Sequence, residues 1–253
     1  MKRLLLLLLI AFSGCATTLP VPNADPGDPA AAWARVLQRH VDASGRVDFA
    51  GLAAADSDLR SWVAAIARQA PNNAPGAFAT SAEVLAFHIN AYNALAMYNV
   101  IAAGIPERLS LADRVRFFKL TRVVIGGKPI SLYDYENDII RRLGDPRVHF
   151  ALNCMAASCP RLPRSPFTAA GLEVELESVS REFFNDPRHV LVDETANSVR
   201  VSAILDFFPE DFLAVAPSLR AYVNRYRTVK LPDSASFGFL EYDWTINRQG
   251  RPP

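Results

Sequence analysis

Cysteine is scarce in this chain, which has three cysteines in 253 residues. Cys15 closes an N-terminal segment typical of an export signal, so Cys154 and Cys159 are the cysteines left for the folded body. Both lie in one short stretch that begins at His149 and ends at Pro160. Any cysteine chemistry is therefore expected in that stretch.

The chain also lacks an excess of charge of either sign. Its 27 basic and 26 acidic residues become 25 and 26 when Lys2 and Arg3 of the export signal are left out, a net charge near −1. A near-neutral surface gives no electrostatic reason to expect a nucleic-acid partner. The body of the sequence has no second long apolar run, no internal repeat and no low-complexity block.

Common catalytic motifs are absent as well. The sequence has no Gly-x-Ser-x-Gly and no His-Glu-x-x-His, and its one pair of adjacent glycines, Gly126-Gly127, falls in a predicted hairpin. These absences remove support for a serine hydrolase, a zinc peptidase or a nucleotide-binding protein. The sequence therefore predicts no cofactor.

The N-terminal segment combines Lys2-Arg3, an apolar run from Leu4 to Phe12, and Ser13-Gly14-Cys15. The run is too short to span a bilayer as a helix. Its end resembles the lipobox of bacterial lipoproteins, in which the cysteine is lipidated, and two or more acyl chains anchor a protein stably. Ala16, where Asp would retain such a protein at the inner membrane, favours the outer membrane. We expect an outer membrane lipoprotein of the cell envelope that faces the periplasm; the alternative is a soluble periplasmic protein cleaved elsewhere.

Three parts follow from this interpretation. Residues 1–15 are the predicted lipoprotein signal, ending at the lipidated Cys15. Residues 16–29 are rich in proline and poor in hydrophobic side chains, which predicts a flexible tether. Residues 30–253 are long enough for one domain with a sizeable core.

Periodicity and capping signals predict a mostly helical domain with antiparallel β-hairpins. A strand followed by a turn and a second strand is indicated over residues 123–130 and again over 190–201. Since helices and hairpins are interleaved without regular strand–helix–strand alternation, we expect a single α+β domain. The predicted helices cover residues 29–41, 56–69, 81–103, 133–143, 168–185 and 217–226.

The helix predicted from Ser81 is apolar on nearly all sides, which indicates burial, yet it carries several polar residues. Buried amides need partners, because an unsatisfied one costs roughly 1–3 kcal/mol. In one interpretation these side chains hold loops that cross the core. In the other, Asn90 and Glu83 form a wall of a polar pocket, and Asn93 joins them in binding a substrate.

Four segments carry a resemblance to a known family. They are Ala86-Phe87-His88-Ile89-Asn90-Ala91-Tyr92-Asn93-Ala94, the Gly126-Gly127 hairpin with Ile130-Ser131-Leu132, the stretch from His149 to Pro160, and Tyr242-Asp243-Trp244-Thr245-Ile246-Asn247. Their order resembles the family called domain of unknown function 547 (DUF547), over about residues 33–248. By this resemblance the chain is identified as a bacterial lipoprotein member.

The family name assigns no activity to its members, so the resemblance implies none for this chain. Some eukaryotic members resemble fusions with glutaredoxin-like domains, which points toward thiol chemistry. Members typically have Trp where this chain has His88, and often His where it has Asn137. If the family's histidine is a catalytic base, this chain lacks it, and His149 is the expected base instead.

The geometry of the central stretch limits what it can do. In a continuing strand, His149 and Cys154 would face opposite sides, so they meet only if the strand ends near Leu152 or Asn153. A short helix beginning at Met155 would place Cys154 at a helix N-terminus, where the dipole favours the thiolate. Cys154 would then be a nucleophile with His149 as its base and Asn90 as an oxyanion donor.

Two other interpretations of the cysteines stay open. A disulfide between Cys154 and Cys159 is possible in an oxidising compartment if the chain between them is irregular, because a regular helix holds the α-carbons too far apart. Alternatively, both are unreactive buried thiols. A metal site is not predicted, since the cysteines and His149 supply only three nearby ligands in a spacing unlike zinc patterns.

Two further residues are candidate substrate ligands. Arg161, next to Arg164, can bind an anion, and Asp243 belongs to the closing motif. Two functions remain: a cysteine-dependent enzyme performing acyl transfer, hydrolysis or thiol exchange, or a non-catalytic envelope lipoprotein with a structural disulfide. In either function the expected partners are the membrane, through the lipid anchor, and an unknown small molecule or envelope protein.

Overall fold

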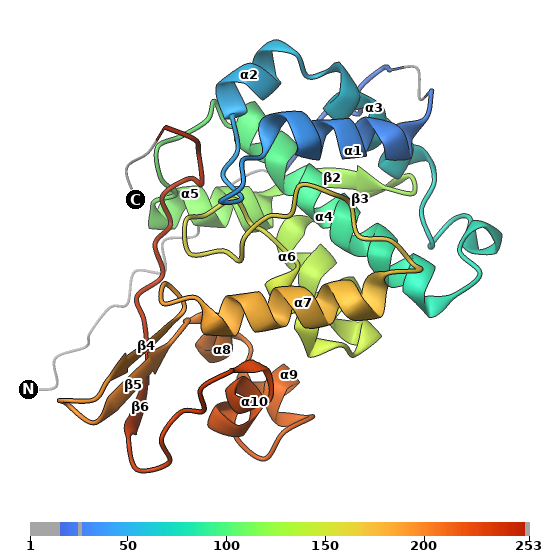
Figure 1. Cartoon of the computed structure of the whole chain (residues 1–253). Helices are drawn as coiled ribbons and strands as arrows, with labels where there is room; N and C mark the ends of the chain where they lie inside the picture. The colour runs from blue at the N-terminus through green and yellow to red at the C-terminus, as the bar shows by residue number, and fades with distance from the viewer. Residues whose placement is uncertain (1–15, 25–26, 251–253) are drawn as a thin grey trace, which may run out of the picture.

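Helix α4 (Ser81–Ala102) runs through the centre of the protein, and the other elements are arranged around it (Figure 1). The computed structural model describes residues 16–24 and 27–250. The predicted signal over residues 1–15, including Cys15, lies outside the described residues. Helix α4 begins with a complete capping box between Thr80 and Glu83. Nearly every residue from Leu85 to Val100 is buried, as its apolar composition predicts.

Three helices from the N-terminal part of the chain cover one side of α4. Helices α1 and α3 pack against each other, and α3 packs against α4 (Figure 1). The short helix α2, which follows the turn at Gly45, is absent from the sequence prediction. These helices are α1 (Pro29–His40), α2 (Phe49–Ala54) and α3 (Ser57–Arg68), with the 3-10 turn η1 (Pro75–Ala77) before α4.

After α4 the chain forms short, irregular helical segments. They comprise α5 (Leu111–Val115) with the π-helical η2 (Arg116–Leu120), then α6 (Leu132–Asp134), the π-helical η3 (Tyr135–Ile140), and the 3-10 segments η4 (Arg141–Leu143) and η5 (Pro146–Phe150). The helix predicted over 133–143 is therefore present as several turns of differing pitch. Such π-helical turns are rare in proteins overall, but those that occur often lie at functional sites.

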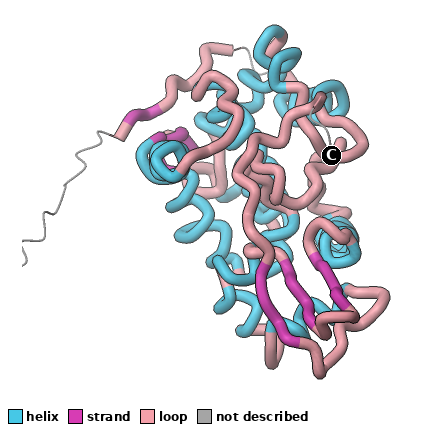
Figure 2. Tube along the Cα trace, turned by 90° about the vertical axis from the view of Figure 1, so that its left-hand side faces the viewer, coloured by secondary structure: helices cyan, strands magenta, loops and turns pink. Residues whose placement is uncertain are grey.

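Two small sheets lie apart from each other with helices between them (Figure 2). In the first, β2 (Thr121–Ile125) and β3 (Lys128–Ser131) form the predicted hairpin, and β1 (Thr17–Thr18) pairs with β2 in parallel. In the second, β4 (Val190–Asp193) and β5 (Ser198–Val201) form the other predicted hairpin, which β6 (Ser236–Phe239) extends in parallel.

The C-terminal part of the chain builds its own core around this second sheet. Aromatic side chains dominate it, including Phe150, Phe184 and Tyr222, all fully buried. Helix α7 lies between this core and the α4 core (Figure 1). The helices of this C-terminal part are α7 (Leu172–Asn185), α8 (Ile204–Phe207), α9 (Pro209–Leu213) and α10 (Leu219–Tyr226).

The predicted α+β class is confirmed, and the local structure differs from what the sequence suggested at three places. The tether is held in place at its start, because Thr17–Thr18 pairs with β2 and the Tyr98 hydroxyl donates to the Pro20 carbonyl at 3.1 Å. The strand considered from His149 onward does not form: His149 lies in the 3-10 segment η5, which Asp145 caps and Pro146 begins. No helix starts at Met155 among the described residues; that residue has φ +67°.

Within residues 16–24 and 27–250, none of the helices combines the length and the apolar character that crossing a membrane requires.

Candidate functional site

A pocket of about 290 Å³ opens beside α4, and both cysteines line it. The volume is close to the lower end of the range for small-molecule sites. Most of the wall is aromatic or aliphatic, with a smaller number of polar side chains. The aromatic residues of the wall are Tyr92, Phe118, Tyr133, Phe207, Phe208, Tyr242 and Trp244.

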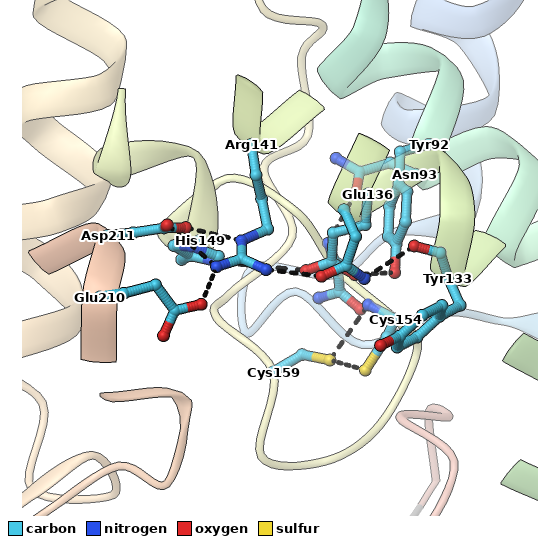
Figure 3. A network of polar contacts seen from close by, with 12 residues as sticks. Tyr92, Asn93, Tyr133, Glu136, Arg141, His149, Cys154, Cys159, Glu210 and Asp211 are labelled. Carbon is cyan, nitrogen blue, oxygen red and sulfur yellow. Dashed lines mark hydrogen bonds and ion pairs between the residues drawn. The ribbon is translucent and has the colours of Figure 1, made fainter. Parts of the chain in front are cut away.

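Cys154 and Cys159 lie together as free thiols, with their Sγ atoms 2.7 Å apart (Figure 3). The Tyr242 hydroxyl contacts both sulfurs, at 3.4 Å from Cys154 and 3.3 Å from Cys159. The backbone N–H of Cys154 also donates to the Cys159 sulfur at 3.1 Å. The loop is therefore irregular enough to bring the thiols together, but the structural disulfide predicted as an alternative is not present among the described residues.

These contacts make the two thiols unequal. Burial opposes ionisation of Cys159, but hydrogen bonds from the Cys154 thiol, the Tyr242 hydroxyl and backbone N–H groups outweigh it and lower the pKa of Cys159. The pKa of Cys154 is raised well above its usual value by its hydrogen bond to Cys159 and by burial. Burial also raises the pKa of Tyr242, so its hydroxyl keeps its proton and remains a donor. These donors favour Cys159 over Cys154 as the thiolate of the pair. No helix begins at Met155 among the described residues, so the helix dipole expected at Cys154 is absent.

The cysteine loop is fixed from the side of α4. Asn93 donates to the Ala151 carbonyl at 2.9 Å and accepts from the Asn153 N–H at 2.7 Å. The Asn153 side chain in turn donates to the Pro160 carbonyl at 2.7 Å and accepts from the Met155 N–H at 2.8 Å. Because Asn93 uses its amide in this way, it positions the loop from outside the pocket wall.

The segment that carries the closing motif fixes the loop from the other side. Ala156 forms a β-bridge with Ile246, and the Asn247 N–H donates to the Met155 carbonyl at 2.8 Å. The left-handed backbone of Met155 turns the chain between these bonds. The same segment brings Tyr242 to the thiols, across more than eighty residues of sequence.

His149 lies in the pocket wall but does not pair with a cysteine. Its Nε2 is 2.8 Å from Asp211 and its Nδ1 is 3.9 Å from Glu136, so both ring nitrogens face carboxylates. Its ring stacks on Phe208 at 4.3 Å. Among the described residues no hydrogen bond joins His149 to either thiol, so the predicted Cys154–His149 pair does not form.

A row of polar groups that the sequence did not indicate continues from His149 (Figure 3). Arg141 binds Asp211 through two nitrogens, at 2.7 and 2.9 Å, and also pairs with Glu210. Burial opposes ionisation of Asp211, but hydrogen bonds from His149 and Arg141 lower its pKa to about 2. The pair of charges therefore stays ionised and holds the imidazole in place.

Glu136 is the carboxylate among the residues that line the pocket, and the Tyr92 hydroxyl donates to it at 3.0 Å. Burial raises the pKa of Glu136 despite favourable contacts with His149 and Tyr92. Asn137, where the family often has His, lines the pocket next to it and accepts from Arg141 at 2.5 Å. That family position was the one sequence signal that pointed to this side of the pocket.

The remaining predicted site residues lie away from the pocket wall. Asn90 accepts from Trp33 at 3.1 Å and exchanges two hydrogen bonds with the Phe167 backbone. Asn90 does not line the pocket, so none of its contacts supports the predicted oxyanion role. Glu83 closes the capping box of α4.

Arg161 pairs with Glu182 at a separate, smaller depression. Asp243 accepts from the Thr245 hydroxyl at 2.6 Å and shapes the closing segment. Within the described ranges, no group of three or more His, Cys, Asp or Glu side chains is arranged to hold a metal ion.

Fold and site together define a class: an α+β protein with a paired-thiol pocket fixed by a central helix and a C-terminal segment. The model of the family described as a protein of unknown function, DUF547, matches residues 77–184. This region belongs to that family, which confirms the predicted family; it includes α4, the polar row up to His149 and both cysteines. None of the curated proteins or solved structures compared with the chain matches it.

Proposed function

We propose that this protein carries out dithiol–disulfide exchange at Cys154 and Cys159, with Cys159 as the attacking thiolate. The observation that carries the proposal is the 2.7 Å separation of the two sulfurs in a ligand-sized pocket. A disulfide bond is about 2.05 Å long, so only a small movement is needed to form one. Tyr242 supplies a hydrogen bond to whichever sulfur carries the charge.

Acyl transfer and hydrolysis receive less support from the same geometry. Both need a base within hydrogen-bond reach of the nucleophile. His149, the expected base, is occupied by Asp211 and lies beside Glu136. Thiol exchange needs no such base, because the thiolate is already stabilised by its donors.

The proposed reaction conserves atoms and electrons. The Cys159 thiolate attacks one sulfur of a substrate disulfide, forming a mixed disulfide and breaking the substrate S–S bond. The first leaving thiolate takes the proton of Cys154. The Cys154 thiolate then attacks the Cys159 sulfur, forming the protein disulfide and releasing the second substrate thiolate. The substrate disulfide is reduced and the protein dithiol is oxidised; the reverse sequence oxidises two substrate thiols.

The location in the cell is part of the proposal. The lipobox-like Ser13-Gly14-Cys15 after an apolar run supports a lipid-anchored protein of the envelope. Such a compartment permits disulfides to persist. Incorporation of a labelled fatty acid into the wild-type chain, and its loss in Cys15→Ser, is the expected outcome in cells.

Intact-mass analysis of the full chain with Cys15→Ser tests the chemistry. After incubation with 2-hydroxyethyl disulfide, we expect the loss of two hydrogens and no stable adduct, because the second thiol displaces the first adduct. Cys154→Ser should accumulate one adduct on Cys159, and Cys159→Ser should react much more slowly. Independent adducts on both cysteines would contradict the proposal.

A second outcome would favour the alternative function. If neither thiol reacts in the native protein and both react after unfolding, the pocket is that of a non-catalytic binding protein. The apolar wall of the pocket is the observation that supports this alternative.

A further inference from the structure

Two cationic side chains in the pocket wall are not paired with acidic side chains in the described part of the chain. Arg114 and Lys119 both line the pocket, and both come from the segment formed by α5 and η2. Among the residues that the structure describes, neither is within ion-pair distance of a carboxylate. Arg141, by contrast, is fully engaged by Asp211 and Glu210.

Arg114 is held against the pocket with hydrogen-bonding capacity left over. Its guanidinium carbon lies 4.8 Å from the centre of the Trp244 ring, and its Nε is buried without a hydrogen-bond partner. A buried donor without a partner costs free energy, so an acceptor supplied by a ligand would be favoured there. Lys119 Nζ lies 4.3 Å from the centre of the Tyr133 ring.

The rim of the pocket exposes apolar side chains to solvent. Leu111 is 71% exposed, and Val115, Tyr133 and Phe207 are each 44% exposed. Single exposed apolar residues are common, but a cluster around a pocket is typical of a binding site. The pocket therefore offers an apolar surface of rim and wall next to two unpaired positive charges.

We infer that the pocket binds an amphipathic organic acid, with an apolar body among the aromatic rings and a carboxylate on Arg114 and Lys119. This inference rests on the proposed function, since it makes the substrate of the exchange an apolar thiol or disulfide that carries an acid group.

Glu136 is the acidic group on the pocket wall that opposes such a ligand. Its burial favours the neutral form of the carboxyl, which weakens its repulsion of an anionic ligand. The acid is therefore expected to bind with its charge toward α5 and η2, and its apolar body toward the cysteines.

Calorimetric titration with octanoate tests the inference without any thiol chemistry. The full chain with Cys15→Ser is held in phosphatidylcholine nanodiscs, and empty nanodiscs give the background. Octylammonium and 1-octanol have the same apolar body with a positive or a neutral head. We expect octanoate to bind at least about tenfold more tightly than either, the scale of one charge-assisted hydrogen bond.

Variants assign the charge selectivity to its residues. Arg114→Gln with Lys119→Gln should remove the preference for octanoate, whereas Arg116→Gln should keep it, because Arg116 is an exposed arginine of the same segment outside the pocket wall. Equal binding of the three probes, or an unchanged preference in the double variant, would overturn the inference.

The two proposals can fail separately. Octanoate binding should persist in Cys154→Ser with Cys159→Ser, which cannot exchange disulfides. Disulfide exchange without octanoate binding would overturn the acid substrate and leave the exchange in place. Octanoate binding without exchange in the wild-type thiols would keep the acid site and overturn the proposed reaction.

Discussion

The buried asparagines of α4 have backbone partners, whereas the buried polar groups of the pocket mainly have one another. Asn90 and Asn99 bind the backbones of Phe167 and Phe117, and Asn93 binds the cysteine loop. At the pocket, the Cys154 thiol contacts the Cys159 thiol, and the His149 ring contacts the Asp211 carboxylate. Backbone partners fix loops, while partners that titrate shift each other's pKa. The first region therefore supports the pocket, and the second is where we propose the chemistry.

The largest effect is expected where the two regions join, at Asn93. Asn93→Ala leaves the Ala151 carbonyl and the Asn153 N–H without partners in the interior, at about 1–3 kcal/mol each. We expect the free energy of unfolding in urea to fall by about 2–6 kcal/mol. Asn99→Ala is the matched control, since it leaves one acceptor unpaired, the Phe117 carbonyl, and should cost less. An equal or larger loss for Asn99→Ala would break the comparison.

Acid should destabilise the fold through two buried histidines. Burial lowers the pKa of His88 and of His189 to about 4, below the ordinary value of about 6.5 in the unfolded chain. The folded state therefore binds fewer protons, so stability is complete above neutral pH and falls as the pH drops from about 6.5 toward 4. Each histidine contributes up to about 3 kcal/mol of this loss.

The variant His88→Gln sharpens that prediction, because glutamine can still hydrogen-bond the Tyr135 hydroxyl and does not titrate. The slope of unfolding free energy against pH between 6.5 and 4 should become shallower by about half. An unchanged slope would show that His88 titrates normally in the folded protein.

Tyr242→Phe should change reactivity more than stability. It removes the hydroxyl that donates to the thiolate while keeping the ring. The pKa of Cys159 should rise, and its alkylation rate at neutral pH should fall about 10- to 100-fold, the range for one hydrogen bond to a charged group. Peptide-resolved mass spectrometry after brief iodoacetamide treatment measures this rate. A wild-type rate in the variant would contradict the role given to the hydroxyl.

The smallest effect is expected at Arg161, predicted from the sequence as a substrate ligand. Its ion pair with Glu182 is partly exposed, and such pairs contribute about 1 kcal/mol or less. Arg161→Ala should leave both disulfide exchange and octanoate binding unchanged in the assays above. A tenfold loss of octanoate affinity would move the acid site away from Arg114.

Local signals in the sequence were enough for much of the fold. The capping box at Thr80 and Glu83, the Gly126-Gly127 turn and the apolar composition of α4 each act within a few residues. Helix α2 and strand β6 were missed, because short elements carry little periodicity and β6 depends on its pairing with β5.

The sequence indicated the stretch of chain that lines the pocket, but not the contacts that its side chains make. His149, Cys154 and Cys159, which the sequence places in one short segment, all line the pocket. The left-handed Met155 and the bridge from Ala156 to Ile246 are set by a segment ninety residues further along the chain, and no local pattern reveals them. For the same reason, the sequence assigned the thiolate to Cys154 when the donors gather on Cys159.

The most direct test of this account is the pH dependence of alkylation at each cysteine in the native chain with Cys15→Ser, resolved by peptide mass spectrometry. We predict that Cys159 reacts faster than Cys154, with a rate that titrates below the ordinary thiol pKa of about 8.5. A faster reaction at Cys154, or a Cys159 rate that rises only above pH 8.5, would contradict a paired-thiol site with Cys159 as its thiolate.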